Sequence, residues 1–309
     1  MNVRHNLISV VAWLAGGILL AGCDSTDEPA PATADVVAAT AAEHEHDAPT
    51  PTPAAEAAPA QPVLEQDLAY GEGARSNLVG FLAMPADAAE PLPGVIVIHE
   101  WWGLNDNIKA ITRRLAAEGY VALAVDLYGG QIADTPEHAQ ELMTAFLNEP
   151  EAAKRNLSQA YDYLDKYAFA PRVASIGWCL GGGWSLQAAL LFPDTLDAMV
   201  MYYGQVDTNR ERLATLKMPL LGFFGGEDTS IPVFEVQAFR STLSQLGKNA
   251  EVLIVPGVGH AFANPSGGTY NERAASDAWT KTLDFLEHNL KLSVPSQSTE
   301  QAEPAQPLR

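Results

Sequence analysis

The sequence predicts an α/β protein, with a mainly parallel β-sheet and helices on both faces of the sheet. Short apolar runs alternate with longer amphipathic segments over residues 63–292. This alternation is typical of parallel strands joined by crossover helices. Most of the runs are apolar throughout, instead of at every second position, which indicates strands buried on both faces. A stretch of about 230 residues is long enough for one domain of this class.

The expected elements follow one another in a regular order. Residues 94–99, Gly-Val-Ile-Val-Ile-His, form a clear apolar run, and residues 108–118 then carry apolar side chains at helical spacing. Further strands are expected at residues 120–125, 173–176, 198–203, 219–224 and 252–255. Further helices are expected at residues 136–147, 152–167, 183–191, 234–245 and 272–289.

The first 22 residues have the pattern of a secretory signal peptide. Arg4 precedes an apolar run over residues 7–20, and the segment contains no acidic residue. It ends in Leu-Ala-Gly followed by Cys23, which resembles the lipobox of bacterial lipoproteins. The resemblance implies cleavage before Cys23 and lipid modification of this cysteine. We therefore expect an exported protein that is lipid-anchored to the bacterial cell envelope, on the periplasmic side.

Two polar segments flank the predicted domain. Residues 23–62 are rich in Ala and Pro, with eight acidic residues and no Lys or Arg, so we expect a disordered acidic tether. Residues 293–309 are expected to form a disordered tail. Within the tether, residues 43–47 read Glu-His-Glu-His-Asp, which we interpret as a solvated patch because no rigid frame surrounds it. A metal-binding surface protein built on this patch is kept as an alternative.

Composition excludes several classes of protein. Two cysteines in 309 residues cannot support a disulfide scaffold. A formal net charge of −20 opposes binding to nucleic acid, because the phosphate backbone would be repelled. The sequence has neither a dinucleotide-binding glycine motif nor a phosphate-binding loop, and no closed set of metal ligands, so neither a cofactor nor a metal ion is expected.

The most informative motif is G-x-C-x-G at residues 177–181. It directly follows the predicted strand at residues 173–176 and leads into a helical pattern. This is the arrangement of the nucleophile elbow of α/β-hydrolases, with Cys179 in the position of the usual serine. The turn is so tight that glycines are needed on either side of the nucleophile. The following helix N-terminus favours the thiolate form of Cys179.

Two later residues complete a candidate catalytic set. Asp228 follows the strand at residues 219–224, and His260 follows the strand at residues 252–255. Both lie past the carboxyl ends of strands, where open α/β sheets place their sites. The order nucleophile, acid, histidine is that of α/β-hydrolases. We expect His260 to serve Cys179 as base or ion-pair partner, and Asp228 to fix the tautomer of His260.

Four segments together resemble the dienelactone hydrolase (carboxymethylenebutenolidase) family over residues 63–292. They are Val-Ile-His-Glu-Trp-Trp-Gly at 97–103, Asp-Leu-Tyr at 126–128, Gly-Trp-Cys-Leu-Gly-Gly at 177–182 and Gly-His-Ala-Phe at 259–262. The resemblance implies an α/β-hydrolase fold, with Cys179, Asp228 and His260 as the triad. It also implies that Glu100 contacts the resting cysteine until substrate displaces it.

The resemblance extends to the surroundings of the triad. The backbone amides of Leu180 and Trp101 are expected to form the oxyanion hole. The side chains of Trp102 and Trp178 are expected to line the substrate pocket, alongside Trp101.

One departure from the family concerns the substrate. The family holds its substrate carboxylate with two arginines, but this chain has Asn264 at one of these positions and Pro136 at the other. Residues 131–149 contain no Arg or Lys. A substrate carboxylate would therefore be unpaired, which favours a neutral ester or lactone.

The sequence thus predicts a hydrolase that cleaves a carboxylic ester or lactone through a thiol acyl-enzyme. A thioester or amide hydrolase with the same triad is an alternative, and so is a non-catalytic ligand-binding module of the same fold. The expected partners are a small-molecule substrate and the membrane, through Cys23. The sequence gives no indication of the oligomeric state.

Overall fold

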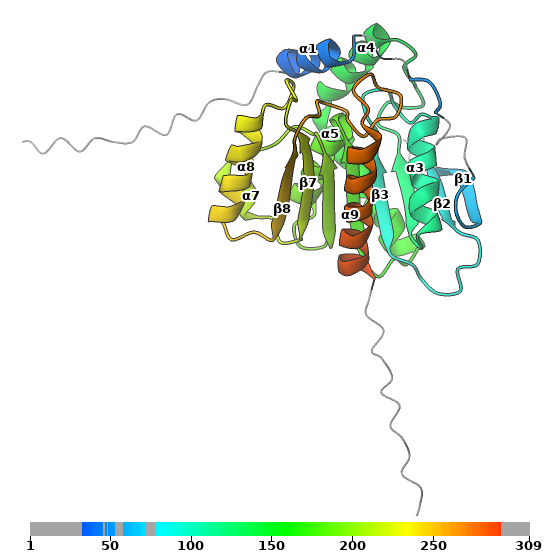
Figure 1. Cartoon of the computed structure of the whole chain (residues 1–309). Coiled ribbons are helices and arrows are strands. Elements are labelled where there is room, and N and C mark those ends of the chain that lie inside the picture. The colour runs from blue at the N-terminus through cyan, green and yellow to red at the C-terminus, as the bar shows by residue number, and fades with distance from the viewer. Residues whose placement is uncertain (1–32, 46, 48, 53–57, 72–77, 292–309) are drawn as a thin grey trace, which may run out of the picture. The chain divides into compact units, whose positions relative to one another are not determined.

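An eight-stranded sheet forms the centre of the fold (Figure 1). The structure is a computed structural model, and it describes residues 33–45, 47, 49–52, 58–71 and 78–291. The strand order is β1-β2-β4-β3-β5-β6-β7-β8. β3 to β8 run parallel, and β1 and β2 are antiparallel additions at one edge. The predicted mainly parallel sheet is therefore confirmed. The strands are β1 Val63–Ala69, β2 Val79–Pro85, β3 Gly94–Ile98, β4 Val121–Val125, β5 Val173–Trp178, β6 Ala198–Tyr202, β7 Leu220–Gly225 and β8 Ala250–Val255.

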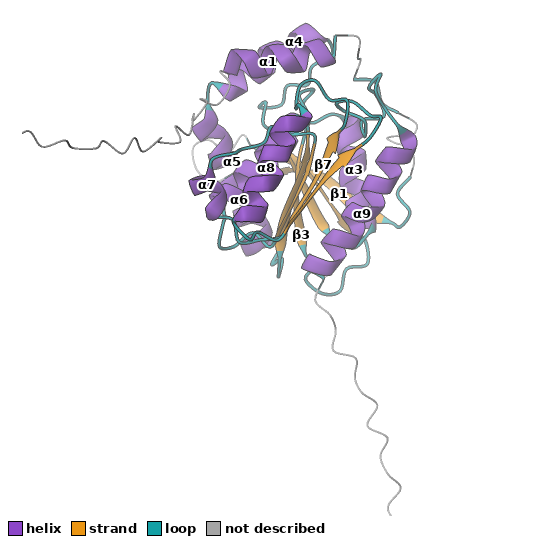
Figure 2. Ribbon diagram, turned by 60° about the vertical axis from the view of Figure 1, so that its left-hand side comes forward, coloured by secondary structure: helices purple, strands orange, loops and turns teal. Residues whose placement is uncertain are grey.

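Helices cover both faces of the sheet, as predicted (Figure 2). Alternate residues of β3 show the two faces: Val95 and Val97 pack with α3 and α9, whereas Ile96 and Ile98 belong to the core cluster that includes α4, α5, α6 and α8. This alternation follows from the two-residue period of a strand. The helices are α1 Thr33–Glu43, α3 Asp106–Ala117, α4 Pro136–Leu147, α5 Pro150–Asp162, α6 Leu180–Leu191, α7 Arg210–Ala214, α8 Val233–Gln245 and α9 Glu272–Leu290.

Most predicted elements are found within a few residues of their expected bounds, and the exceptions have local causes. The expected helix at residues 152–167 becomes α5 followed by a π-helical turn, Tyr163–Tyr167. The sequence pattern predicts neither β1 nor β2 as strands, nor the short helix α7. β1 is largely exposed on the edge of the sheet, so its sequence has no continuous apolar run.

α6 begins three residues earlier than expected, because its glycines belong to the helix and not to a loop. A Cβ atom on Gly181 would lie 2.3 Å from the carbonyl oxygen of Ile98, and one on Gly182 would lie 2.5 Å from that of Tyr202. The glycines therefore allow the first turn of α6 to pack directly against the backbone at the ends of β3 and β6. Glycine normally weakens a helix, which is why the pattern predicted a later start.

Part of the predicted tether is ordered, which corrects our expectation for residues 23–62. Residues 33–43 form α1, which lies against α4 in both views (Figures 1 and 2). Val37 and Thr40 are buried, and Val37 joins the core cluster on the α4 side. Alanine-rich sequence favours a helix, and a single apolar stripe is enough to attach it to a neighbouring helix.

The remaining predictions on the termini fall outside the described residues. These are the signal peptide at residues 1–22, lipidation of Cys23 and the tail at residues 293–309. Among the helices that are described, none is long and apolar enough to cross a membrane.

Candidate active site

Cys179 lies in the tight turn between β5 and α6, with its side chain presented at the carboxyl edge of the sheet. Its backbone has φ 52° and ψ −119°, a conformation that a non-glycine residue adopts only under strain. Gly177 makes the turn possible, since a Cβ there would lie 2.1 Å from the carbonyl oxygen of Gly181. The local geometry is that of a nucleophile elbow, as the motif predicted.

Asp228 and His260 come together as expected, from the loops that follow β7 and β8. His260 Nδ1 lies 2.9 Å from Asp228 Oδ2. The other oxygen of Asp228 accepts hydrogen bonds from the backbone amides of Ser230 and Ile231, at 2.9 and 2.8 Å. These bonds fix the carboxylate, which in turn orients the imidazole so that its Nε2 faces the Cys179 sulfur.

The site favours charge separation between the thiol and the imidazole. Burial alone raises the pKa of the Cys179 thiol, but the charges and hydrogen bonds of His260 and His44 outweigh it and lower this pKa to about 6. Burial lowers the pKa of His260, yet the Cys179 thiolate and Asp228 together raise it well above its usual value. A thiolate facing an imidazolium is the activated state of a cysteine nucleophile.

Glu100 lies beside the thiol, just after the end of β3, and is buried. Its Oε2 accepts a hydrogen bond of 2.7 Å from Asn264 Nδ2, and Tyr203 donates to Oε1 at 3.4 Å. Burial and the nearby Cys179 charge raise the pKa of Glu100 to about 7. The preceding His99 donates from Nδ1 to the Glu100 carbonyl oxygen at 2.6 Å, which holds this corner of the site in place.

The predicted pocket residues divide into two groups. Trp101 and Trp102 are fully buried and lie next to each other, with ring centroids 4.8 Å apart. Both rings also contact His44, which lies beside His260 of the candidate catalytic set. Trp178 stacks on Tyr202 inside the core cluster on the other face of the sheet. Leu180 is the first residue of α6, so its amide belongs to the helix N-terminus beside Cys179.

A second histidine–aspartate pair reaches the site from the segment that we expected to be a tether. The ring of His44 stacks on Trp101 at 4.8 Å and meets His260 edge-on at 5.6 Å. Its Nδ1 lies 2.7 Å from Asp47 Oδ2, while Asp47 Oδ1 accepts from the Gly268 amide at 2.8 Å. Burial lowers the pKa of His44, but Asp47 and Cys179 raise it to about 9.

The sequence contained a signal for this pair, which we interpreted differently. Residues 43–47, Glu-His-Glu-His-Asp, stand out in an otherwise Ala- and Pro-rich segment. The sequence favours a solvated patch here because no rigid frame surrounds these residues along the chain. The structure supplies that frame, since Asp47 accepts a hydrogen bond from the Gly268 amide, 221 residues further along the chain.

The parallel sheet, the crossover helices and the elbow-type turn together define an α/β-hydrolase. The dienelactone hydrolase family model matches residues 78–290. A protein of Saccharolobus solfataricus, provisionally named as a carboxymethylenebutenolidase, is 34% identical over 261 residues, covering 72% of this chain and 98% of its own. Protein usf of Aquifex pyrophilus is 35% identical over 218 residues, which cover 68% of this chain and 93% of its own.

A solved structure agrees with this assignment. A Klebsiella pneumoniae protein, provisionally named as a dienelactone hydrolase, superimposes with a TM-score of 0.62 at 28% identity, covering 72% of this chain and 98% of its own. The chain belongs to the dienelactone hydrolase family. It is therefore a hydrolase-family protein, and membership implies a small-molecule substrate.

Proposed function

We propose that the protein hydrolyses a neutral carboxylic ester or lactone through a thiol acyl-enzyme. The observation that carries this proposal is the placement of Cys179 on a strained turn, facing His260. The Nδ1 atom of His260 lies 2.9 Å from Asp228 Oδ2, which orients the ring. A ligand-binding module of the same fold would need neither the strain at the cysteine nor a buried, oriented imidazole.

The reaction follows from the roles of the groups. The Cys179 thiolate attacks the acyl carbon, and the resulting oxyanion is stabilised by the backbone amides of Leu180 and Trp101. The carbon–oxygen bond to the leaving group breaks as His260 transfers its proton to the departing oxygen. His260 then takes a proton from water, and the hydroxide attacks the thioester. Collapse of the tetrahedral adduct breaks the carbon–sulfur bond, releases the carboxylic acid and restores the thiolate–imidazolium pair.

The neutrality of the substrate is inferred from Asn264 and Glu100. Asn264 stands where the family's classical enzymes carry an arginine, and its amide is engaged with Glu100 at 2.7 Å. A substrate carboxylate near Glu100 would meet another acidic group instead of a guanidinium. An ester or lactone without a second carboxylate avoids this repulsion.

Trapping the acyl-enzyme tests the proposed reaction. The protein is mixed with a panel of nitrophenyl esters and lactones, quenched in acid, and its Cys179 peptide is examined by mass spectrometry. We expect an acyl adduct on Cys179 with at least one substrate, together with turnover. No adduct on Cys179, or equal turnover by Cys179→Ala, would refute the mechanism. Thioester and amide analogues in the same panel distinguish the alternative substrate classes.

We further propose that the mature protein is exported and lipid-anchored at Cys23. The support is the charged start, the apolar run of residues 7–20 and the Leu-Ala-Gly-Cys ending at Cys23. This arrangement would place the hydrolase domain in the cell envelope, where lipidation removes the other cysteine of the chain from reaction with Cys179.

A further inference from the structure

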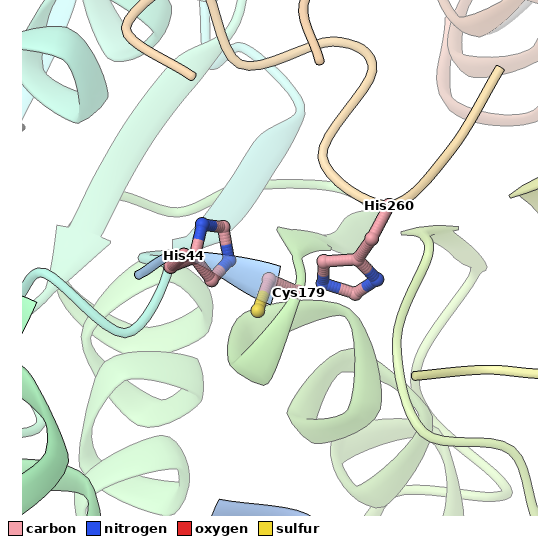
Figure 3. Close-up of side chains that lie close together, drawn as sticks. All are labelled: His44, Cys179 and His260. Atoms are coloured by element: carbon pink, nitrogen blue, oxygen red, sulfur yellow. The ribbon is translucent and has the colours of Figure 1, made fainter. Parts of the chain in front are cut away.

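Three side chains of the kinds that bind metal ions converge at the edge of the sheet. The imidazole rings of His44 and His260 lie on either side of the Cys179 side chain (Figure 3). One donor atom from each of these residues lies within 4.8 Å of the other two. The residues are 1%, 3% and 4% exposed, so water competes poorly for the donors. The proposed hydrolysis uses Cys179 and His260 but gives no role to His44.

The two histidines are oriented in the same way. His44 Nδ1 is bound to Asp47 at 2.7 Å, and His260 Nδ1 is bound to Asp228 at 2.9 Å. Within the described part of the chain, neither Nε2 has a nitrogen or oxygen hydrogen-bond partner, although both are buried. In protein metal sites, a ligating histidine commonly donates its other N–H to a carboxylate, which fixes the ring and makes the ligating nitrogen more basic.

We propose that His44, Cys179 and His260 bind a divalent first-row metal ion, with Zn²⁺ as the best match to the donors. One thiolate and two imidazoles suit Zn²⁺ by ligand type, and three protein donors leave a fourth tetrahedral position for water or a small anion. Donors on a common zinc ion lie roughly 3.3–3.8 Å apart, given the usual Zn–N and Zn–S bond lengths. Since the donor atoms lie within 4.8 Å of one another, the site has to contract by up to about 1.5 Å, which side-chain rotation can supply.

The charges of the site fit a divalent cation. With neutral imidazoles, the Cys179 thiolate and the carboxylates of Asp47 and Asp228 place three negative charges in a buried region, and the buried carboxyl group of Glu100 lies beside the thiol. A dication offsets two of them, and buried charges are costly unless they are compensated. Binding releases the thiol proton and any imidazolium protons to solvent, so affinity should fall as the pH is lowered.

The metal site goes beyond the proposed hydrolysis, because a metal ion on Sγ withdraws the electron pair that would attack an ester. The two activities are mutually exclusive at Cys179. The N-terminal segment supplies His44 and Asp47, so it turns a catalytic cysteine–histidine pair into a three-ligand site.

Cobalt spectroscopy tests the proposal without any need for turnover. The full chain, without a polyhistidine tag, is reduced, freed of metal and titrated with Co²⁺, and the bound Co²⁺ is then displaced by Zn²⁺. We expect the protein to bind one equivalent of Co²⁺. The complex should show a thiolate-to-cobalt charge-transfer band in the near ultraviolet, and d–d bands with the intensity typical of tetrahedral coordination. Absence of stoichiometric binding, or a spectrum without the thiolate band, would overturn the proposal.

Three variants locate the site. His44→Ala should weaken Zn²⁺ binding at least about tenfold, and Asp47→Asn should weaken it by a similar factor through loss of the carboxylate partner. Cys179→Ser should remove the charge-transfer band. His138→Ala is the matched control, because His138 is a partly exposed histidine on α4, with Nδ1 3.3 Å from Asp134 Oδ1, and its loss should leave the affinity unchanged. Equal affinities in wild type and His44→Ala would contradict the site.

Ester hydrolysis provides a separate readout. If the protein hydrolyses an ester, Zn²⁺ should inhibit the wild type, EDTA should reverse the inhibition, and His44→Ala should be less sensitive to Zn²⁺. If it hydrolyses no ester, the cobalt spectrum still decides whether the metal site exists, so failure of one proposal is distinguishable from failure of the other.

Discussion

At the scale of single residues, the main feature of the site is the buried sulfur of Cys179, which lies between the imidazoles of His44 and His260. Its pKa is lowered to about 6, mainly because the charge and hydrogen bond of His260 overcome the effect of burial. Since the folded-state pKa is below that of a free thiol, the thiolate persists as the pH falls until about pH 6. Alkylation by iodoacetamide requires the thiolate.

The alkylation rate of Cys179 should therefore have its midpoint near pH 6, compared with about 8.5 for an unperturbed cysteine. The rate is followed by the mass of the Cys179 peptide, which separates it from any reaction at Cys23. Model thiols alkylated under the same conditions provide the reference. A midpoint near 8.5 would show that the imidazoles do not stabilise the thiolate.

His44→Ala should move this midpoint upward, because His44 is the second group that lowers the pKa of Cys179. His138→Ala, which changes a partly exposed histidine on α4, should leave the midpoint in place. An unchanged midpoint in His44→Ala would mean that His44 does not face the thiol in solution.

At the scale of elements, the sequence was most informative where side chains repeat regularly. The apolar strands and α3, α4, α8 and α9 follow from periodicity alone, and Asp228 and His260 follow from their places after β7 and β8. The start of α6 did not, because its glycines are required by backbone contacts with β3 and β6, which a linear pattern does not show. The position of His44 was not predictable either, because it depends on long-range docking of α1.

The close packing of α6 can be tested at Gly181. A Cβ there would lie 2.3 and 2.5 Å from the carbonyl oxygens of Ile98 and His99, which are backbone atoms and cannot move aside easily. Gly181→Ala should therefore reduce the free energy of unfolding by about 2–3 kcal/mol, the upper part of the usual range for overpacking. Gly183→Ala is the control in the same helix, since its nearest contact would be 3.3 Å, and its effect should stay within about 1 kcal/mol. Denaturant unfolding measures both, and equal values would contradict the packing argument.

Docking of α1 is expected to limit access to Cys179, because it holds His44 beside the buried thiol. The side chain of Val37 is buried against the domain, whereas that of the adjacent Ala38 is exposed. Val37→Asp should detach α1 and withdraw His44. At a pH above the Cys179 midpoint of both proteins, where the thiolate predominates, alkylation of Cys179 should then be faster, because about 1.4 kcal/mol of docking free energy corresponds to a tenfold change. Ala38→Asp adds the same charge one residue away and should leave the rate near that of the wild type. If both variants react at the wild-type rate, the segment does not shield the site.

At the scale of the whole molecule, the parallel sheet explains why distant residues meet. Glu100, Cys179, Asp228 and His260 each follow a strand of the parallel part of the sheet, so their side chains gather at its carboxyl edge. The N-terminal segment crosses this edge as an additional layer and contributes His44. The candidate catalytic set thus depends on sheet topology, whereas the additional histidine depends on a segment that the family model, matching residues 78–290, does not include.

The N-terminal part of the chain also determines where we expect the enzyme to act. If Cys23 is the lipidated residue, the full-length protein expressed in a Gram-negative bacterium should be recovered with the membranes, and its N-terminal peptide should carry the mass of the acyl groups. Cys23→Ser should abolish this modification, because serine offers no thiol for the lipid. Cys179→Ser is the matched control, since it removes the other cysteine and should remain with the membranes. Unmodified wild-type protein in the soluble fraction would refute the anchor while leaving the chemistry at Cys179 untouched, because the anchor and the site use different cysteines.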